Sequence, residues 1–267
     1  MKDLWTTVKA LLLFFLSQML GIVGTFLIMA FRPGFDIADP DAFDKLRADM
    51  DPVLYGMVSL VCTLLLIWLL CATRLTSPRP LRSFAKGMPK GWGWSIVGFM
   101  LVSFGLSMIL DPFSLENEEV MQTLLAMKGN LWCALLLVVA GPVVEELIFR
   151  DCITRVLHRS GTILAVVCSA FAFAVIHGNL MQGIPAFFMG VVLALLYLHT
   201  GDVRLCIPAH ICNNLTSYLQ MYLDANSRFL SSWSDSILII AGVLLLAAGG
   251  FTLYVFLHPE KPLQNKI

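Results

Sequence analysis

The stretch GPVVEELIFR, residues 141–150, places two adjacent glutamates inside a run that otherwise has the composition of a membrane span. Burying one charged side chain at the bilayer centre costs roughly 2.5–3.5 kcal/mol even on lenient insertion scales. A lipid-facing helix would not tolerate Glu145 and Glu146. The pair therefore predicts helices that meet around a polar cavity, and the rest of the sequence must supply those helices and the partners of the two carboxylates.

The composition places the whole chain in a membrane. Of the 267 residues, 58% are hydrophobic and 13% are charged, and the mean hydropathy is +0.81. Soluble domains have about 25% charged residues, so an integral membrane protein is expected. The formal net charge is zero, and the basic residues are scattered over short connections rather than gathered in a patch. No nucleic-acid partner is therefore expected.

The apolar runs predict eight transmembrane helices, since a helix needs about 20 apolar residues to cross the hydrocarbon core. Four strongly apolar runs cover residues 10–31, 53–72, 92–110 and 237–257, and four weaker runs cover residues 131–144, 162–176, 184–198 and 205–223. The weaker runs contain Glu, His, Asn, Pro and Gly, which are tolerated in the interior of a bundle. The predicted fold is an all-α polytopic bundle of about eight helices around a polar intramembrane cavity.

No linker and no internal repeat divides the chain, so residues 1–267 are expected to form one membrane domain. Its basic residues are unevenly distributed when the connections are assigned alternately to the two sides. One side receives 13 of the 18 Lys and Arg residues and the other receives five. Because basic connections remain in the cytoplasm, both termini are predicted to be cytoplasmic.

Polar residues in the weaker spans are spaced one helical turn apart. The i, i+4 pairs are Glu146 with Arg150, Phe173 with His177, and His210 with Asn214. In the first pair the acid precedes the base, which is the favourable order for an ion pair. Pro142 predicts a kink just before the glutamates. Pro208 suits a first helical turn and predicts that His210 lies near a helix N-terminus, where the imidazole would stay neutral.

Two of the polar residues are predicted to lie at the same depth. Glu145 and His177 are each 16 residues from Gly161, where we expect the turn of a helical hairpin. At 1.5 Å per residue, both would lie about 24 Å from that turn.

A carboxylate, two imidazoles and a carboxamide in one cavity suit hydrolysis by an activated water. A carboxylate could take the proton from water while neutral His and Asn side chains donate hydrogen bonds to the oxyanion that forms. Alternatively, Glu145, His177 and His210 could bind Zn²⁺ with one coordination position left open for water. The sequence does not separate these two mechanisms.

The polar residues form three motifs in a fixed order: Glu145-Glu146-x-x-x-Arg150, then Phe173-x-x-x-His177, then His210-x-x-x-Asn214. This order resembles the three-motif signature of the CPBP family. This family comprises CAAX proteases and bacteriocin-processing enzymes, is also called Abi, and includes the type II CAAX prenyl protease. A single motif would be weak, but three in order on successive apolar segments, within residues 145–214, are specific. The resemblance implies an intramembrane endopeptidase that cleaves a membrane-embedded or lipid-modified protein or peptide.

The resemblance also implies residue roles. Glu145 would activate water with the help of His177. The oxyanion or metal site would be formed by His210 and Asn214. Supporting positions would be held by Glu146, Arg150 and Phe173. Metal dependence is disputed for the family, so zinc held by Glu145, His177 and His210 stays an alternative. Membrane lipid would be a further partner, and a bacterial cell membrane is the expected location.

Alternatives to this interpretation remain at the level of the sequence. The glutamates could lie at the cytoplasmic end of a span and pair with Arg150 and Arg155. Asn213 could replace Asn214 as the functional amide, and Cys212 is more simply explained as an inert buried thiol than as a nucleophile. For the whole chain, a non-proteolytic bacteriocin-immunity or scaffold protein is the main alternative. A transporter is disfavoured because no half of the sequence is repeated.

Overall fold

The computed structural model describes residues 2–32, 35–36, 38–73, 75–76, 87–113, 118–223 and 233–258. Within these ranges the chain forms helices and no strand. The long helices are α1 (Lys2–Ala30), α3 (Pro52–Ala72), α5 (Trp92–Leu110), α10 (Thr162–Val175), α11 (Leu180–Thr200), α12 (Val203–Gln220) and α13 (Asp235–Leu257). Short helices α2 (Ala42–Ala48), η1 (Asp111–Phe113) and α6 (Glu118–Ala126) lie in the connections.

One further helix runs without interruption through the motif of the two glutamates. It consists of α7 (Leu131–Ala134), η2 (Leu135–Ala140), α8 (Gly141–Glu146), η3 (Leu147–Thr154), α9 (Arg155–Leu157) and η4 (His158–Ser160). The segments η2 and η3 are π-helical, with wider turns than an α-helix, and η4 is a 3₁₀ turn. The π-helical turns lie on both sides of the glutamates, and such turns often occur at functional sites.

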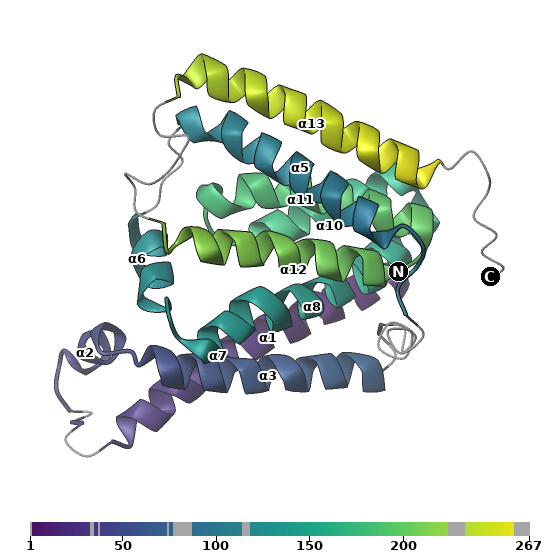
Figure 1. Ribbon diagram of the computed structural model, residues 1–267. Helices are drawn as coiled ribbons and strands as arrows, with labels where there is room; N and C mark the ends of the chain where they lie inside the picture. The colour runs from purple at the N-terminus through teal and green to yellow at the C-terminus, as the bar shows by residue number, and fades with distance from the viewer. Residues whose placement is uncertain are drawn as a thin grey trace.

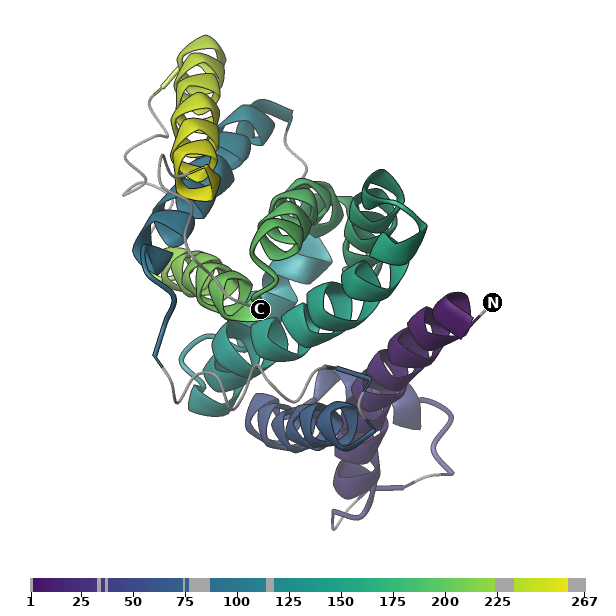
Figure 2. The same ribbon diagram turned by 90° about the vertical axis from the view of Figure 1, so that its right-hand side faces the viewer.

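The helices are arranged in three layers (Figure 1). Helices α5 and α13 pack together on one flank, and α1 packs on α3 on the opposite flank. The long helix with α8 lies between them together with α10, α11 and α12, and the same order is visible from the side in Figure 2. The motif-bearing helices are therefore enclosed by the two outer pairs.

The predicted class, an all-α membrane protein, is confirmed. Each of the eight predicted spans is helical, and six of the described helices are long and apolar enough to cross a membrane. The other two are α10, which has only 14 residues, and α12, which has 18 residues but a more polar composition. Because α12 is packed against α5, α8, η2 and α11, most of its surface faces protein and can be polar. The count of eight spans is therefore approximate.

The turn predicted at Gly161 is present. The helix of the glutamates ends with η4, Gly161 adopts a φ of 136°, and α10 begins at the next residue. A positive φ of this size favours glycine, because other residues would be strained there. His177 then follows the end of α10, in the short connection to α11.

The prediction about Pro208 was wrong. Helix α12 begins at Val203, and the side chain of Asp202 caps it by accepting a hydrogen bond from the backbone N–H of Arg204. Pro208 is therefore inside the helix, and His210 lies more than one turn from its N-terminus. The helix dipole acts mainly within the first turn, so it does not determine the state of His210.

Candidate active site

Glu146 and Arg150 form a fully buried ion pair. Both side chains are 0% exposed, and Arg150 Nε lies 3.2 Å from Glu146 Oε2. The guanidinium carbon of Arg150 lies 4.7 Å from the centre of the Phe173 ring, in a cation–π contact. The guanidinium has no hydrogen-bond acceptor among the described residues. The ion pair and the aromatic face are thus what compensates the buried charge of Arg150.

His210 lies between the two glutamates. Its Nδ1 is 2.8 Å from Glu146 Oε1, and its Nε2 is 3.7 Å from Glu145 Oε2. A carboxylate only accepts hydrogen bonds, so Nδ1 is the donor to Glu146. The Nε2 atom therefore faces Glu145. It bears a lone pair if the ring is neutral and a second N–H if the ring is protonated.

The two glutamates differ in exposure. The side chain of Glu145 is 19% exposed, whereas that of Glu146 is fully buried. A Cβ atom placed on Gly141 would come within 3.8 Å of Glu145 Oε1, so the carboxylate folds back alongside this glycine. Glu145 is thus the carboxylate that open space can reach, and Glu146 is the one that holds neighbouring side chains.

Phe173 separates the two imidazoles. Its ring contacts His177 edge-on at 5.0 Å and His210 edge-on at 5.7 Å, measured between ring centres. His177 Nδ1 lies 2.8 Å from the backbone oxygen of Phe173 and donates to it, because a carbonyl can only accept. In the neutral ring this leaves Nε2 of His177 as a free acceptor for a proton or a hydrogen bond.

The backbone explains the position of Asn214. In η2 the N–H of Gly141 donates to the carbonyl of Leu136, five residues back. The next donor in this register would be Pro142, which has no N–H for the carbonyl of Leu137. Asn214 Nδ2 donates to that carbonyl at 3.0 Å. Pro142, just before the first motif, thus leaves free the carbonyl that anchors the asparagine of the third.

Two further polar side chains extend from Asn214 toward α5. The hydroxyl of Ser103 on α5 donates to Asn213 Oδ1, and Asn213 Nδ2 lies 3.5 Å from Asn214 Oδ1, near the long limit of a hydrogen bond. Asn213 thus contacts the Asn214 amide. Nothing in the sequence distinguished Ser103 from Ser95 and Ser107 in the same apolar span.

A second buried polar cluster follows Arg150 on the same helix. Asp151 is 3% exposed and accepts a hydrogen bond from the hydroxyl of Tyr197 at 3.1 Å. Arg155 Nε donates to the backbone oxygen of Asp151, and its guanidinium also donates to the backbone oxygen of Leu75. Arg155 is therefore a partner of Asp151 rather than of the glutamate pair. The sequence analysis missed Asp151, a carboxylate in an apolar run.

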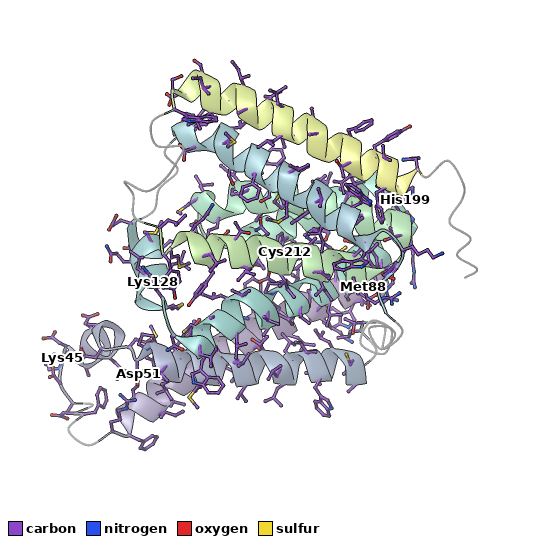
Figure 3. The ribbon with its side chains drawn as sticks, viewed as in Figure 1. Lys45, Asp51, Met88, Lys128, His199 and Cys212 are labelled. Carbon is purple, nitrogen blue, oxygen red and sulfur yellow. The ribbon has the colours of Figure 1, made fainter. Side chains whose placement is uncertain are left out.

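Cys212 shows no feature of a nucleophile. It lies midway along α12, as labelled in Figure 3, and is only partly exposed. All seven cysteines of the chain are free thiols.

The described side chains do not fit the three-ligand zinc site considered above. No group of three or more His, Cys, Asp or Glu side chains within the described ranges is arranged to hold a metal ion. This includes Glu145, His177 and His210. His210 uses Nδ1 to bind Glu146 and His177 uses Nδ1 to bind the Phe173 backbone, so each ring leaves Nε2 for the site.

An apolar groove lies beside His177. It has a volume of about 560 Å³ and is bordered by the connection at Gly178 and Asn179. Its apolar walls come from α10 and α11 and include Phe171, Val175, Leu180, Ile184, Phe187 and Phe188. Asn179 Nδ2 donates to the backbone oxygen of His177, so one wall of the groove is tied directly to the histidine.

Comparison with known proteins adds independent support. A family model described as "Type II CAAX prenyl endopeptidase Rce1-like" matches residues 127–216. YdiL of Bacillus subtilis (strain 168), named as a candidate membrane peptidase, is 23% identical over 256 residues, which cover 92% of this chain and 99% of YdiL. Both matches support the resemblance to the CPBP family of CAAX-type proteases. The matched segment contains all three motifs. No solved structure shows significant similarity to this chain.

Together with the six apolar helices, these matches support an integral membrane peptidase of the CAAX type, which implies a membrane-associated substrate.

Proposed function

We propose that this protein hydrolyses a peptide bond of a lipid-modified or membrane-embedded protein or peptide, with Glu145 as the general base. The observation that supports this proposal best is the pair of glutamates joined by His210, one fully buried and one 19% exposed. Two carboxylates in different environments can take different roles. Glu145 takes the proton of the attacking water, while Glu146 holds the histidine.

His177 is the second group at the water. Because its Nδ1 donates to the Phe173 backbone, its Nε2 is the atom that can accept a hydrogen bond from water. An acceptor there orients the water so that its other proton points to Glu145 and a lone pair points to the scissile carbonyl. After attack, Glu145 returns the proton to the leaving amine.

His210 and Asn214 stabilise the oxyanion. One N–H of the Asn214 amide is used on Leu137, and the second is available to the substrate carbonyl. His210 already donates through Nδ1 to Glu146, so it donates through Nε2 only as imidazolium. Fixed donors of this type contribute about 2.7–4 kcal/mol each.

Glu146, Arg150 and Phe173 support the site. Glu146 binds Arg150 on one carboxylate oxygen and His210 on the other, while Phe173 contacts both histidines and the guanidinium. We therefore assign to these three residues the orientation of His210 and His177 rather than a contact with substrate.

A lipid chain on the substrate would occupy the groove between α10 and α11. The groove is lined mainly by aromatic and aliphatic side chains, and Phe171, Leu180 and Phe188 are exposed. A hydrocarbon or isoprenoid chain could therefore enter from the bilayer and place the attached peptide next to His177.

The whole chain would form one domain with both termini in the cytoplasm of a bacterial cell. The start of α1 and the end of α13 lie on the same side in Figure 1. Lys45 and Lys128 lie at the opposite end of the helices from Met88 and His199 (Figure 3). Both lysines belong to the side with five basic residues. Of the 13 basic residues assigned to the cytoplasm, Arg74, Arg79, Arg82, Lys86, Lys261 and Lys266 lie outside the described residues.

The test uses the purified full-length protein in liposomes and a quenched fluorescent peptide with a prenylated cysteine. Glu145→Gln preserves the side-chain volume and removes the base, so kcat should fall about 10²- to 10⁴-fold with an unchanged unfolding temperature. The matched control is Glu118→Gln, in an exposed glutamate of α6 that binds only Gln122 among the described contacts. Cleavage by Glu145→Gln at the wild-type rate would contradict the proposal.

Metal content decides between the two hydrolytic mechanisms. We expect elemental mass spectrometry to find no zinc that depends on Glu145, and cleavage to persist after dialysis against a chelator. One equivalent of zinc in the wild type that is lost in Glu145→Gln would overturn the role of Glu145 as a base acting without a metal.

A further inference from the structure

A row of hydrogen-bonding groups crosses from α5 to the helix of the glutamates and ends at Asn214. Ser103 donates to Asn213 Oδ1, Asn213 Nδ2 faces Asn214 Oδ1 at 3.5 Å, and Asn214 Nδ2 donates to the Leu137 carbonyl at 3.0 Å. Ser103 and Asn213 belong to none of the three motifs. The row joins residues 110 positions apart in sequence, and α12, which bears both asparagines, packs against α5.

The direction of these hydrogen bonds selects one orientation of the Asn214 amide. An amide has an accepting end and a donating end. As observed, the oxygen faces the NH₂ of Asn213 and the nitrogen faces the carbonyl of Leu137. Rotation by 180° would oppose two NH₂ groups at one end and two oxygens at the other. The observed orientation is therefore the one in which the second N–H of Asn214 stays available to the substrate.

The hydroxyl of Ser103 supplies the donor that the Asn213 oxygen needs at the first position of the row. Because that hydroxyl donates to Asn213 Oδ1, the oxygen of Asn213 points to α5 and its NH₂ group points to Asn214. At the other end, the Leu137 carbonyl accepts from Asn214 because Pro142 cannot supply the backbone donor. The Leu137 carbonyl, which can only accept, thus sets the orientation at one end, and the Ser103 hydroxyl supports it at the other by donating to Asn213.

We infer that Ser103 and Asn213 are positioning residues, which keep the amide of Asn214 in the orientation that donates to the oxyanion. The inference rests on the proposed role of Asn214. It also explains why two asparagines follow one another: Asn214 contacts the substrate, and Asn213 orients the Asn214 amide.

The experiment is a double-mutant cycle on full-length protein in liposomes, with the prenylated quenched peptide as substrate. Ser103→Ala removes the hydroxyl, and Asn213→Asp keeps the acceptor for Ser103 but replaces the NH₂ group that faces Asn214. Each should lower kcat by about tenfold or more and should leave KM nearly unchanged. The upper limit is the roughly 10²- to 10³-fold loss that follows removal of an oxyanion donor. Ser103→Thr, which retains the hydroxyl, should restore most of kcat.

The diagnostic result comes from the Asn214→Ala background. If Ser103 and Asn213 act through Asn214, their substitutions should have no further effect on the residual activity there. Ser107→Ala, in an exposed serine one turn along α5, is the matched control and should leave kcat unchanged.

Two different failures can be told apart. Wild-type kcat in Asn214→Ala would overturn the oxyanion role of Asn214 and with it the proposed function of this residue. The positioning role alone would be overturned by either of two results, given a large loss of kcat in Asn214→Ala. One is unchanged kcat in Ser103→Ala and Asn213→Asp. The other is that these two substitutions lower kcat equally in the wild-type and the Asn214→Ala backgrounds. Unfolding temperatures measured on every variant identify losses that come from a damaged fold.

Discussion

Two regions of the molecule hold their helices together by opposite means. On the outer flank, α5 and α13 meet through glycines: Gly98 faces Gly249, and Gly105 faces Gly242. A Cβ atom on Gly105 would lie 2.6 Å from the carbonyl oxygen of Gly242, so the backbones are in direct contact. In the interior, the helix of the glutamates is joined to α12 by Glu146 and His210 and to α10 by the contact of Arg150 with Phe173.

The difference shows where polar groups are needed in this membrane protein. Apolar helices gain little from the hydrophobic effect inside lipid, so close contact of small residues is enough to hold α5 on α13. Buried charges are more expensive, and a fold retains them where they are used. Helix α5 has both kinds of contact, since its glycines face α13 and its Ser103 faces α12. The glycine contacts between α5 and α13, called the glycine seam below, thus hold in place the helix that carries Ser103.

The largest expected effect on stability comes from breaking the buried ion pair. Arg150→Met should destabilise the protein by about 3–5 kcal/mol, because it leaves the carboxylate of Glu146 buried without its cation. The double substitution Glu146→Gln with Arg150→Met should recover much of that loss, since no unpaired charge remains. Equilibrium unfolding in mild detergent measures both. Equal stability of Arg150→Met and the wild type would show that His210 alone compensates Glu146.

A smaller effect is expected at the glycine seam, where the chain offers a matched pair. A Cβ atom on Gly249 would lie 2.8 Å from the carbonyl of Gly98, whereas one on Gly250 would have no neighbour within 4 Å. Gly249→Ala should therefore cost about 1–3 kcal/mol through overpacking. Gly250→Ala should be neutral or slightly stabilising. Similar unfolding curves for the two variants would mean that the seam is not tightly packed.

The smallest effect is expected for an exposed ion pair. Arg32 donates to Asp51 at 2.9 Å, and this hydrogen bond, helped by the backbone N–H groups of Leu54 and Val53, holds the pKa of Asp51 below its ordinary value of 3.8. Asp51→Asn keeps a good N-cap for α3 but removes the charge. Because the pair is exposed and screened, the loss at pH 7 should be under about 1 kcal/mol.

The pH dependence of that loss identifies its cause. A carboxyl whose pKa is lowered by folding stabilises the folded state above its unfolded pKa, and this contribution disappears as the pH falls through the lower, folded pKa. The difference between Asp51→Asn and the wild type should therefore be present at pH 7 and shrink below pH 3.8. A difference of the same size at pH 7 and at pH 3 would assign it to the cap rather than to the charge.

Much of this architecture could be predicted from local patterns. The apolar runs located every long helix, because length and composition alone decide whether a segment is stable in a bilayer. The i, i+4 spacing predicted the contact of Glu146 with Arg150, since neighbours on one helical face must meet. The same reasoning failed for Pro208, because its place in α12 depends on a cap at Asp202.

The sequence by itself determined the all-helical membrane class, the turn at Gly161 and the order of the three polar motifs, because these follow from composition and from spacing along one helix. Only the tertiary structure decided the partner of each polar group. It assigned His210 to both glutamates, Asn214 to the carbonyl freed by Pro142, and Ser103 to Asn213. Such contacts depend on how separate helices pack and rotate against one another, and residues as far as 110 positions apart leave no periodic signal in the chain.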